Sequence, residues 1–195
     1  MQWQYTKRTD GKIAITLDNC VWDFLFYKNL NLALELPPDE FAVFITREVE
    51  IEGLAIPADD KKAALKDYIA RTRISCDIRT TLVFGFATDG PGPQRVGGFG
   101  QGTFQSQTER EFYAAIREQY LLGKGKKNSQ LTNNEGDAAV AAQSFFSIVL
   151  TCELPNKSGP LRFAAEHGGK ILYMGDFDKS GLTLKAYITN LYGQI

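Results

Sequence analysis

Residues 12–25 read KIAITLDNCVWDFL, a short apolar run followed at once by the periodicity of an amphipathic helix. A β-rich run directly before such a pattern predicts a buried strand that leads into a helix. Asp18 stands at the junction between the two. In open α/β sheets ligands lie beyond the carboxyl ends of the strands, so Asp18 either faces such a site or caps the helix that follows it. The choice depends on whether other acidic residues occupy equivalent positions.

The composition is that of one globular domain of ordinary size. The chain has 195 residues, of which 44% are hydrophobic and 23% are charged, and its formal net charge is −1. This charge balance supplies no overall basic field for nucleic acid. No apolar run is long enough to span a bilayer, and the start shows no signal-segment pattern, so we expect no membrane contact.

The cysteines and the histidine restrict the metal chemistry. The three cysteines are scattered without a C-x-x-C spacing, which indicates neither a zinc site nor a disulfide framework and fits a reducing cytoplasm. The chain has one histidine, His167. A metal would therefore be held by oxygen ligands, which favours Mg²⁺ or Mn²⁺.

Strand and helix patterns alternate along most of the chain. The predicted strands cover residues 13–17, 41–45, 80–86, 147–153 and 170–174. Predicted helices begin near Cys20 and Thr46 and cover residues 59–73, 108–122, 133–143, 161–167 and 182–192, with a turn at 176–181. This alternation predicts an α/β fold, a three-layer α/β/α sandwich with a central, mainly parallel sheet. We expect residues 1–195 to form one domain with a glycine-rich insertion at about residues 79–127.

The expected insertion contains a glycine-dense segment, Gly97-Gly98-Phe99-Gly100-Gln101-Gly102. The segment lacks the spacing of a phosphate-binding loop. We interpret it as a hairpin or flap that carries Arg95, Phe99 and Phe104, with Arg95 as a substrate contact. A purely structural loop is the alternative.

Beyond this segment, Thr108 and Glu111 have the spacing of a capping box at the start of a helix. A basic link with three lysines, Lys124, Lys126 and Lys127, follows that helix. These lysines are the local candidates for phosphate contact, and a solvated surface is the alternative.

Four acidic residues stand where predicted strands end or helices begin: Asp18, Glu52, Asp137 and Glu153. Because the carboxyl ends of parallel strands meet at one edge of a sheet, we expect these acids to converge. Clustered carboxylates raise one another's pKa unless a cation offsets their charge. An all-oxygen metal site of this kind suits phosphodiester hydrolysis. Glu48, one helical turn before Glu52, is the alternative second acid, and a solvated helix start would explain it without a metal.

These motifs resemble those of the PIN-domain nucleases. The sequence DNCV at residues 18–21 stands where the family has a pattern like D-[TS]-[NS]-hydrophobic, and ITREVEIE at residues 45–52 matches its I-T-x-E-V-x-x-E segment. The family's third acid opens an alanine-rich helix, as Asp137 does. Its fourth acid ends a strand in a T-[ND]-[DE]-like pattern, as Glu153 does. The resemblance covers most of residues 12–174.

The resemblance implies that Asp18, Glu52, Asp137 and Glu153 bind Mg²⁺ or Mn²⁺ and cleave single-stranded RNA. Many relatives are toxins held by an antitoxin, so an antitoxin or another regulatory protein is an expected partner, and a homodimer is open. The remaining candidates at the same site are secondary. They are Glu48, Thr151 and Glu135.

Two residues depart from the family pattern. Cys20 stands where the family has a small polar residue, and Glu153 is one methylene longer than aspartate. These departures leave open a second hypothesis, a PIN-like module that binds RNA or protein without cutting it.

A third hypothesis comes from a D-x-D motif, Asp176 and Asp178, at the end of a predicted strand. It is similar to the metal motif of Toprim domains, which also act on phosphodiesters and pair this motif with an earlier glutamate, here Glu48 or Glu52. A turn followed by a helix cap explains the same two aspartates without a metal.

Overall fold

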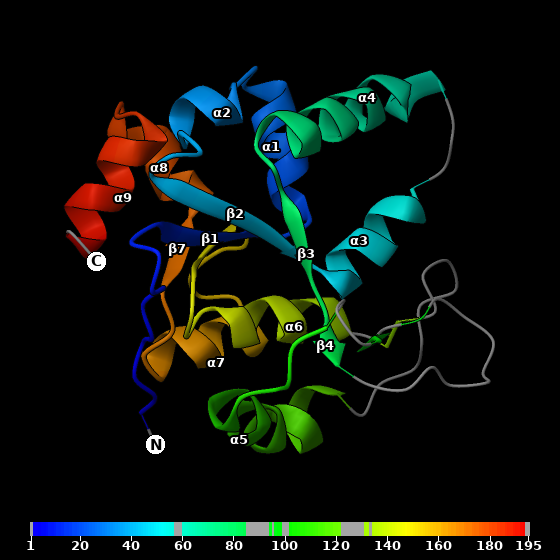
Figure 1. Cartoon of the computed structure of the whole chain (residues 1–195), viewed down its shortest axis with the longest axis vertical. Coiled ribbons are helices and arrows are strands. Elements are labelled where there is room, and N and C mark those ends of the chain that lie inside the picture. The colour runs from blue at the N-terminus through cyan, green and yellow to red at the C-terminus, as the bar shows by residue number, and fades with distance from the viewer. Residues whose placement is uncertain are drawn as a thin grey trace.

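A five-stranded parallel sheet lies at the centre of the protein, with helices on both sides of it (Figure 1). The structure is a computed structural model that describes residues 2–56, 60–84, 94, 96–98, 102–121, 131–132 and 134–193. The strands of the sheet are, in chain order, β1 (Ile13–Leu17), β2 (Phe41–Thr46), β3 (Arg79–Thr81), β6 (Ile148–Thr151) and β7 (Ile171–Tyr173). They lie in the order β3-β2-β1-β6-β7, and every pairing is parallel. The predicted α/β class with a parallel sheet is confirmed.

Helices cover both faces of this sheet. In chain order they are α1 (Cys20–Tyr27), α2 (Leu32–Glu35), α3 (Arg47–Leu54), α4 (Asp60–Ser75), α5 (Gln107–Ile116), α6 (Glu135–Gln143), α7 (Pro160–Glu166), α8 (Met174–Ser180) and α9 (Leu184–Tyr192). In Figure 1, α1, α2 and α4 lie above the strands, α6 and α7 lie below them, and α5 lies beyond α6. Among the described residues, no helix combines the length and the apolar character that a membrane crossing needs.

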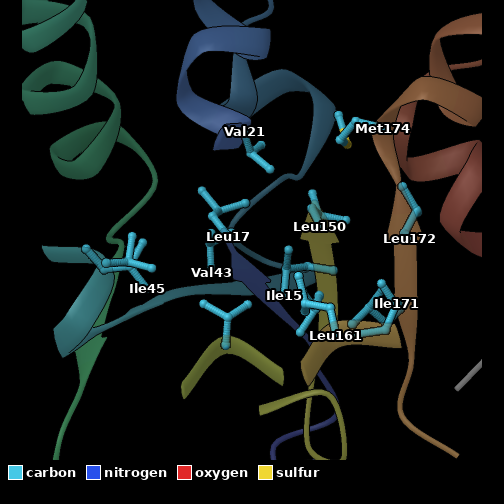
Figure 2. Packing of buried hydrophobic residues seen from close by; sticks show 14 of the residues in the cluster. Ile15, Leu17, Val21, Val43, Ile45, Leu150, Leu161, Ile171, Leu172 and Met174 are labelled. Atoms are coloured by element: carbon cyan, nitrogen blue, oxygen red, sulfur yellow. The ribbon is translucent and has the colours of Figure 1, made fainter. Parts of the chain in front are cut away.

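β1 is the middle strand, and its side chains are buried on both faces. Ile15 and Leu17 are fully buried, as are their partners in β6, Ile148 and Leu150. Figure 2 shows Ile15, Leu17 and Leu150 packed together with Val21 of α1. A strand covered on both faces favours aliphatic residues throughout, which explains the near absence of polar alternation in this part of the sequence.

α6 packs directly against the sheet because its residues are small. All residues from Ala138 to Ala142 are buried, and the helix contacts β1, β2 and β6 as well as α3 and α7. Side chains no larger than valine let the backbone of a helix lie close to the strands. The first turn of α6, which contains Asp137, is thereby held near α3.

The segment after β3 differs from the prediction. The sequence predicted one strand over residues 80–86 followed by a hairpin. Instead, β3 joins the main sheet, and β4 (Val83–Phe84) pairs with β5 (Val96–Gly97) in parallel. A hairpin requires antiparallel strands, so β4 and β5 do not form one, and the alternative of a flap is not tested by this pairing. Glycine and proline mark turns but do not specify the direction in which the next strand pairs.

The start of α5 also differs from the prediction. Ser106 Oγ accepts a hydrogen bond from the Glu109 N–H at 3.1 Å, and Glu109 Oε2 accepts one from the Ser106 N–H at 2.7 Å. The capping box therefore lies two residues earlier than the predicted pair, Thr108 and Glu111. The chain continues beyond α5 as a π-helical turn, η1 (Arg117–Leu121).

The predicted turn at residues 176–181 is mostly helix. α8 follows β7 directly and ends at Gly181, whose φ of +68° is the left-handed conformation that glycine adopts without strain. This glycine separates α8 from α9. The turn pattern in the sequence therefore marks the end of α8.

Candidate functional site

Three of the four predicted acids follow adjacent strands. Asp18 comes directly after β1, Glu52 lies in α3, and Glu153 comes two residues after β6. α3 itself begins directly after β2, and β1 pairs with β2 on one side and with β6 on the other. Because neighbouring strands lie about 4.8 Å apart, the three segments leave the sheet within roughly 10 Å of one another.

Asp18 is buried, and three donors hold its carboxylate. Oδ1 accepts from the Asn19 N–H at 2.7 Å, while Oδ2 accepts from the Thr151 hydroxyl at 2.7 Å and the Cys20 thiol at 3.0 Å. The N-cap residue of α1 is Asn19, so Asp18 does not cap the helix. A threonine at the end of the neighbouring strand thus sets the direction of this carboxylate.

Lys157 interacts electrostatically with three of the predicted acids, Asp18, Asp137 and Glu153. Its Nζ donates a hydrogen bond to Glu153 Oε1. The pKa of Lys157 is raised first by this hydrogen bond and then by the charges of Glu153, Asp137 and Asp18. The ammonium group therefore lies in the field of carboxylates from three separate segments of the chain. Half of the Lys157 side chain is exposed, so solvent reaches the group.

Glu52 lies against α6, beside Gly136. A Cβ atom added to Gly136 would stand 3.4 Å from Glu52 Oε1 and 3.5 Å from Oε2, which is ordinary van der Waals contact. Gly136 immediately precedes Asp137 in the first turn of α6, where the helix dipole favours carboxylates. The fold thus brings Glu52 beside Gly136, the residue that precedes Asp137.

Two secondary candidates, Glu48 and Glu135, act through their charges on a different residue, Tyr113. Glu48, Glu109 and Tyr113 line a cavity of about 220 Å³ formed by α3, α5, α6 and the segment after β3. Burial and the charges of Glu48, Glu109 and Glu135 raise the pKa of Tyr113. These two candidates are therefore grouped by their charges with Tyr113, whereas three of the main acids are grouped with Lys157.

The predicted substrate contacts remain predictions. Arg95, Lys124, Lys126 and Lys127 lie outside the described residues, as does Phe99 of the predicted flap. Phe104, the flap residue that the structure describes, is 82% exposed. Its exposure is compatible with either a contact surface or a structural loop.

The D-x-D motif lies in α8, at the far end of the sheet edge. Asp178 forms an ion pair with Lys28 at 2.6 Å, and Asp176 lies 3.7 Å from Lys179. α8 follows β7, whereas α3 with its glutamates follows β2. Three strand spacings, about 14 Å, separate these two strands. The motif and the glutamate that a Toprim-like site needs therefore start from distant positions.

One residue of the acidic group, Lys157, was not identified from the sequence. It lies four residues after Glu153, but Pro155 and Gly159 exclude a regular helix there, so this spacing carried no signal. Its position among the acids follows from the path of the loop after β6.

A contact between two cysteines was also missed. The Cys152 N–H donates to Cys20 Sγ at 3.0 Å, and the Cys152 thiol donates to the Cys20 carbonyl oxygen at 3.4 Å. The interaction with the Cys152 thiol, together with burial, raises the pKa of Cys20, and the interaction with Cys20 lowers the pKa of Cys152. Each cysteine stands within two residues of a predicted acid, Asp18 or Glu153, and this adjacency was the available signal.

The donors at the site fit a hard divalent cation in their chemistry. They are carboxylate oxygens, the ligands that Mg²⁺ and Mn²⁺ prefer, and the positive charge that they share is that of Lys157. Within the described part of the chain, no three Asp, Glu, His or Cys side chains stand close enough together to hold a metal ion. Binding of a cation would therefore require the ammonium group to leave Glu153 and the acids to draw together.

Comparisons with protein-family models, curated proteins and solved structures find no match to this chain. At this solvent-accessible edge the oriented carboxylates can bind cations and accept protons from water. The ammonium group of Lys157 can attract phosphate.

Proposed function

We propose that the chain is a metal-dependent endoribonuclease of the PIN-domain type, which hydrolyses phosphodiester bonds of single-stranded RNA. The observation that carries this proposal is a set of contacts between two of the acids: Thr151 donates to Asp18 Oδ2 and accepts from the Glu153 N–H, and Glu153 is paired with Lys157. The charges of Asp18, Asp137 and Glu153 also act on Lys157. The packing of the sheet does not require carboxylates from separate segments to lie around one ammonium group. Such a group therefore favours chemistry at the edge of the sheet.

The order of the strands supports the same family. A parallel sheet in the order β3-β2-β1-β6-β7, flanked by helices, is consistent with a Rossmann-like or a PIN-like topology. The strands that precede three of the acids are consecutive neighbours in that order. The strand order supports only the positions of the acids. The metal and the RNA are inferred from the chemistry of the carboxylates.

Mg²⁺ or Mn²⁺ would be held by Asp18, Asp137 and Glu153, with Glu52 beside them. When bound, such an ion supplies positive charge to the phosphate and makes a water molecule more acidic. Oxygen ligands suffice for this chemistry, which agrees with the scarcity of histidine in the chain.

The chain's own residues orient the acids and attract the substrate. Thr151 and Cys20 donate to Asp18 Oδ2 and so hold the carboxylate in one direction. Lys157, once it leaves Glu153, offers an ammonium group to a phosphate oxygen of the RNA. The binding of RNA and the release of this ion pair would then occur together.

The test is cleavage of a labelled single-stranded RNA in the presence of Mn²⁺, Mg²⁺ or EDTA. The wild type should cut with either metal and not with EDTA. Asp137→Asn should lower the rate at least ~100-fold, because it removes the charge while keeping the shape of the side chain. The matched control is Asp178→Asn, at an exposed aspartate paired with Lys28, which should cut as the wild type does. Thermal unfolding of both variants checks that they are folded.

Other results would support the other hypotheses. Cleavage that survives Asp137→Asn but is lost in Asp178→Asn would support the Toprim-like enzyme. Binding of RNA without cleavage by any metal would support a non-catalytic PIN-like module.

A further inference from the structure

Two thiols beside the acidic site are in direct contact. Cys20 begins α1 and Cys152 follows β6, and the strands before them pair with Leu17 opposite Leu150. The Cys152 N–H donates to Cys20 Sγ at 3.0 Å, and Cys152 Sγ donates to the Cys20 carbonyl oxygen at 3.4 Å. The pKa values of the two thiols also depend on each other. Each sulfur therefore lies against the backbone of the other cysteine.

The third cysteine provides an internal comparison. Cys76 is 4% exposed and belongs to the hydrophobic core, where packing explains it. Cys20 and Cys152 are only partly buried, at the edge of the sheet, and all three thiols are free. A disulfide requires two adjacent sulfurs and access for an oxidant. The pair of Cys20 and Cys152 meets both requirements.

We propose that Cys20 and Cys152 form a reversible disulfide with hydrogen peroxide as the oxidant, and that this bond switches the acidic site off. The sulfur of one cysteine attacks the peroxide, breaks the O–O bond and becomes a sulfenic acid, which releases one water. The sulfur of the other cysteine then displaces the hydroxyl group, forms the S–S bond and releases a second water. Both thiol protons leave in these waters, and the pair gives two electrons to one peroxide. A dithiol reductant reverses the step.

Oxidation would act on the acids directly. The Cys20 thiol donates to Asp18 Oδ2 at 3.0 Å, and a disulfide sulfur has no proton to donate. The bond would also fix Cys152, the residue before Glu153, to the start of α1. This consequence rests on the proposed function, whereas the formation of the disulfide does not. Disulfides of proteins in reducing compartments are usually transient and redox-sensing, which fits a reversible bond.

The first experiment counts thiols in the full chain. The protein is treated with a small excess of H₂O₂, denatured and alkylated, and its intact mass and peptides are measured. We expect one alkylated cysteine in place of three, with a cross-linked peptide pair that contains Cys20 and Cys152. Cys76→Ser should form the same bond, and Cys152→Ser should form no intramolecular disulfide. Three alkylated cysteines, or a link through Cys76, would overturn the proposal.

The second experiment compares cleavage rates before oxidation, after oxidation and after re-reduction. The wild type and Cys76→Ser should lose activity at least ~10-fold on oxidation, because the Cys20 thiol then no longer donates to Asp18. Both should recover their activity with a dithiol. Cys152→Ser should keep whatever rate it has when peroxide is added. An unchanged rate in a chain shown by mass to carry the disulfide would overturn the switch. If the reduced chain cuts no RNA, the proposed function and the switch fail together, and the thiol count still decides for or against the disulfide.

Discussion

Thr151 connects two of the acids at the site. The residue is fully buried, and its hydroxyl donates to Asp18 Oδ2 at 2.7 Å while accepting from the Glu153 N–H at 3.1 Å. A hydroxyl group can donate and accept at the same time, whereas valine has nearly the same shape and can do neither. This single side chain therefore relates the direction of the Asp18 carboxylate to the start of the loop after β6.

Thr151→Val should impair both stability and cleavage. Loss of the hydroxyl leaves a buried carboxylate oxygen with one donor fewer, which should lower the free energy of unfolding by about 1–3 kcal/mol. Urea unfolding measures this change, and the RNA assay should show a rate at least ~10-fold lower. Thr151→Ser should retain both. Thr189→Val is the matched control, because the Thr189 hydroxyl bonds to the Lys185 carbonyl on the exposed face of α9. A variant at Thr151 no worse than this control would contradict the prediction.

At the scale of the element, α5 shows how a helix start is chosen between two similar signals. Ser106 and Thr108 each have a glutamate three residues later, so the sequence offers two capping boxes. The fold uses Ser106, whose side chain and backbone both bond to Glu109. Glu109 Oε1 in turn accepts from Gln143 Nε2 at 3.1 Å, which links this start to the end of α6. The contact with α6 favours the earlier box.

Ser106→Ala should therefore destabilise the protein, whereas Thr108→Ala should not. Loss of the cap should lower the free energy of unfolding by about 1 kcal/mol. The matched change at Thr108, inside the first turn of α5, should stay within about 0.5 kcal/mol of the wild type. Urea unfolding of the two variants side by side makes the comparison. The reverse order of effects would show that the later box is the one in use.

On the scale of the whole molecule, Glu50 ties α3 to α4 and β3. Its carboxylate accepts from Arg47 at 2.5 Å, from Arg73 at 2.7 Å and from the Thr80 hydroxyl at 3.1 Å. Burial raises the pKa of Glu50, but the hydrogen bonds from Arg73, Arg47 and Thr80 together outweigh burial and lower it. This network fixes the helix that carries Glu52.

Glu50→Gln should remove a pH-dependent part of the stability. Because the folded-state pKa of Glu50 lies below that of the unfolded chain, its contribution is present above the ordinary glutamate pKa of about 4.3 and is lost as the pH falls through the folded value. At neutral pH the variant should lose about 1–3 kcal/mol, measured by urea unfolding.

Urea unfolding at acidic pH shows in which direction the contribution of Glu50 to stability changes with pH. Below about pH 5 the stability of the wild type should fall more steeply than that of Glu50→Gln. Glu40→Gln, which removes an exposed ion pair with Lys185, should change the stability by less than about 1 kcal/mol at any pH. Parallel pH profiles for the wild type and Glu50→Gln would contradict the assigned role.

The class of fold could be predicted from local patterns. The junction of strand and helix at residues 12–25 and the alanine-rich helix around Ala139 are contained in neighbouring residues, because burial on two faces and helical periodicity select residue types over short distances. The same local signals failed at β4 and β5, since turn residues do not specify the direction of pairing. They also failed at α5, where two capping signals competed.

The amino-acid order alone was enough to predict a parallel sheet between helices, with acids at its carboxyl edge. Which side chains lie together at that edge is decided only by the tertiary structure. Lys157 lies in the field of three acids, and Cys20 touches Cys152, 132 positions away, because β1 and β6 pair in parallel and bring their following loops together. Local periodicity contains no information about contacts between residues so far apart in the chain, and only the pairing of strands creates them.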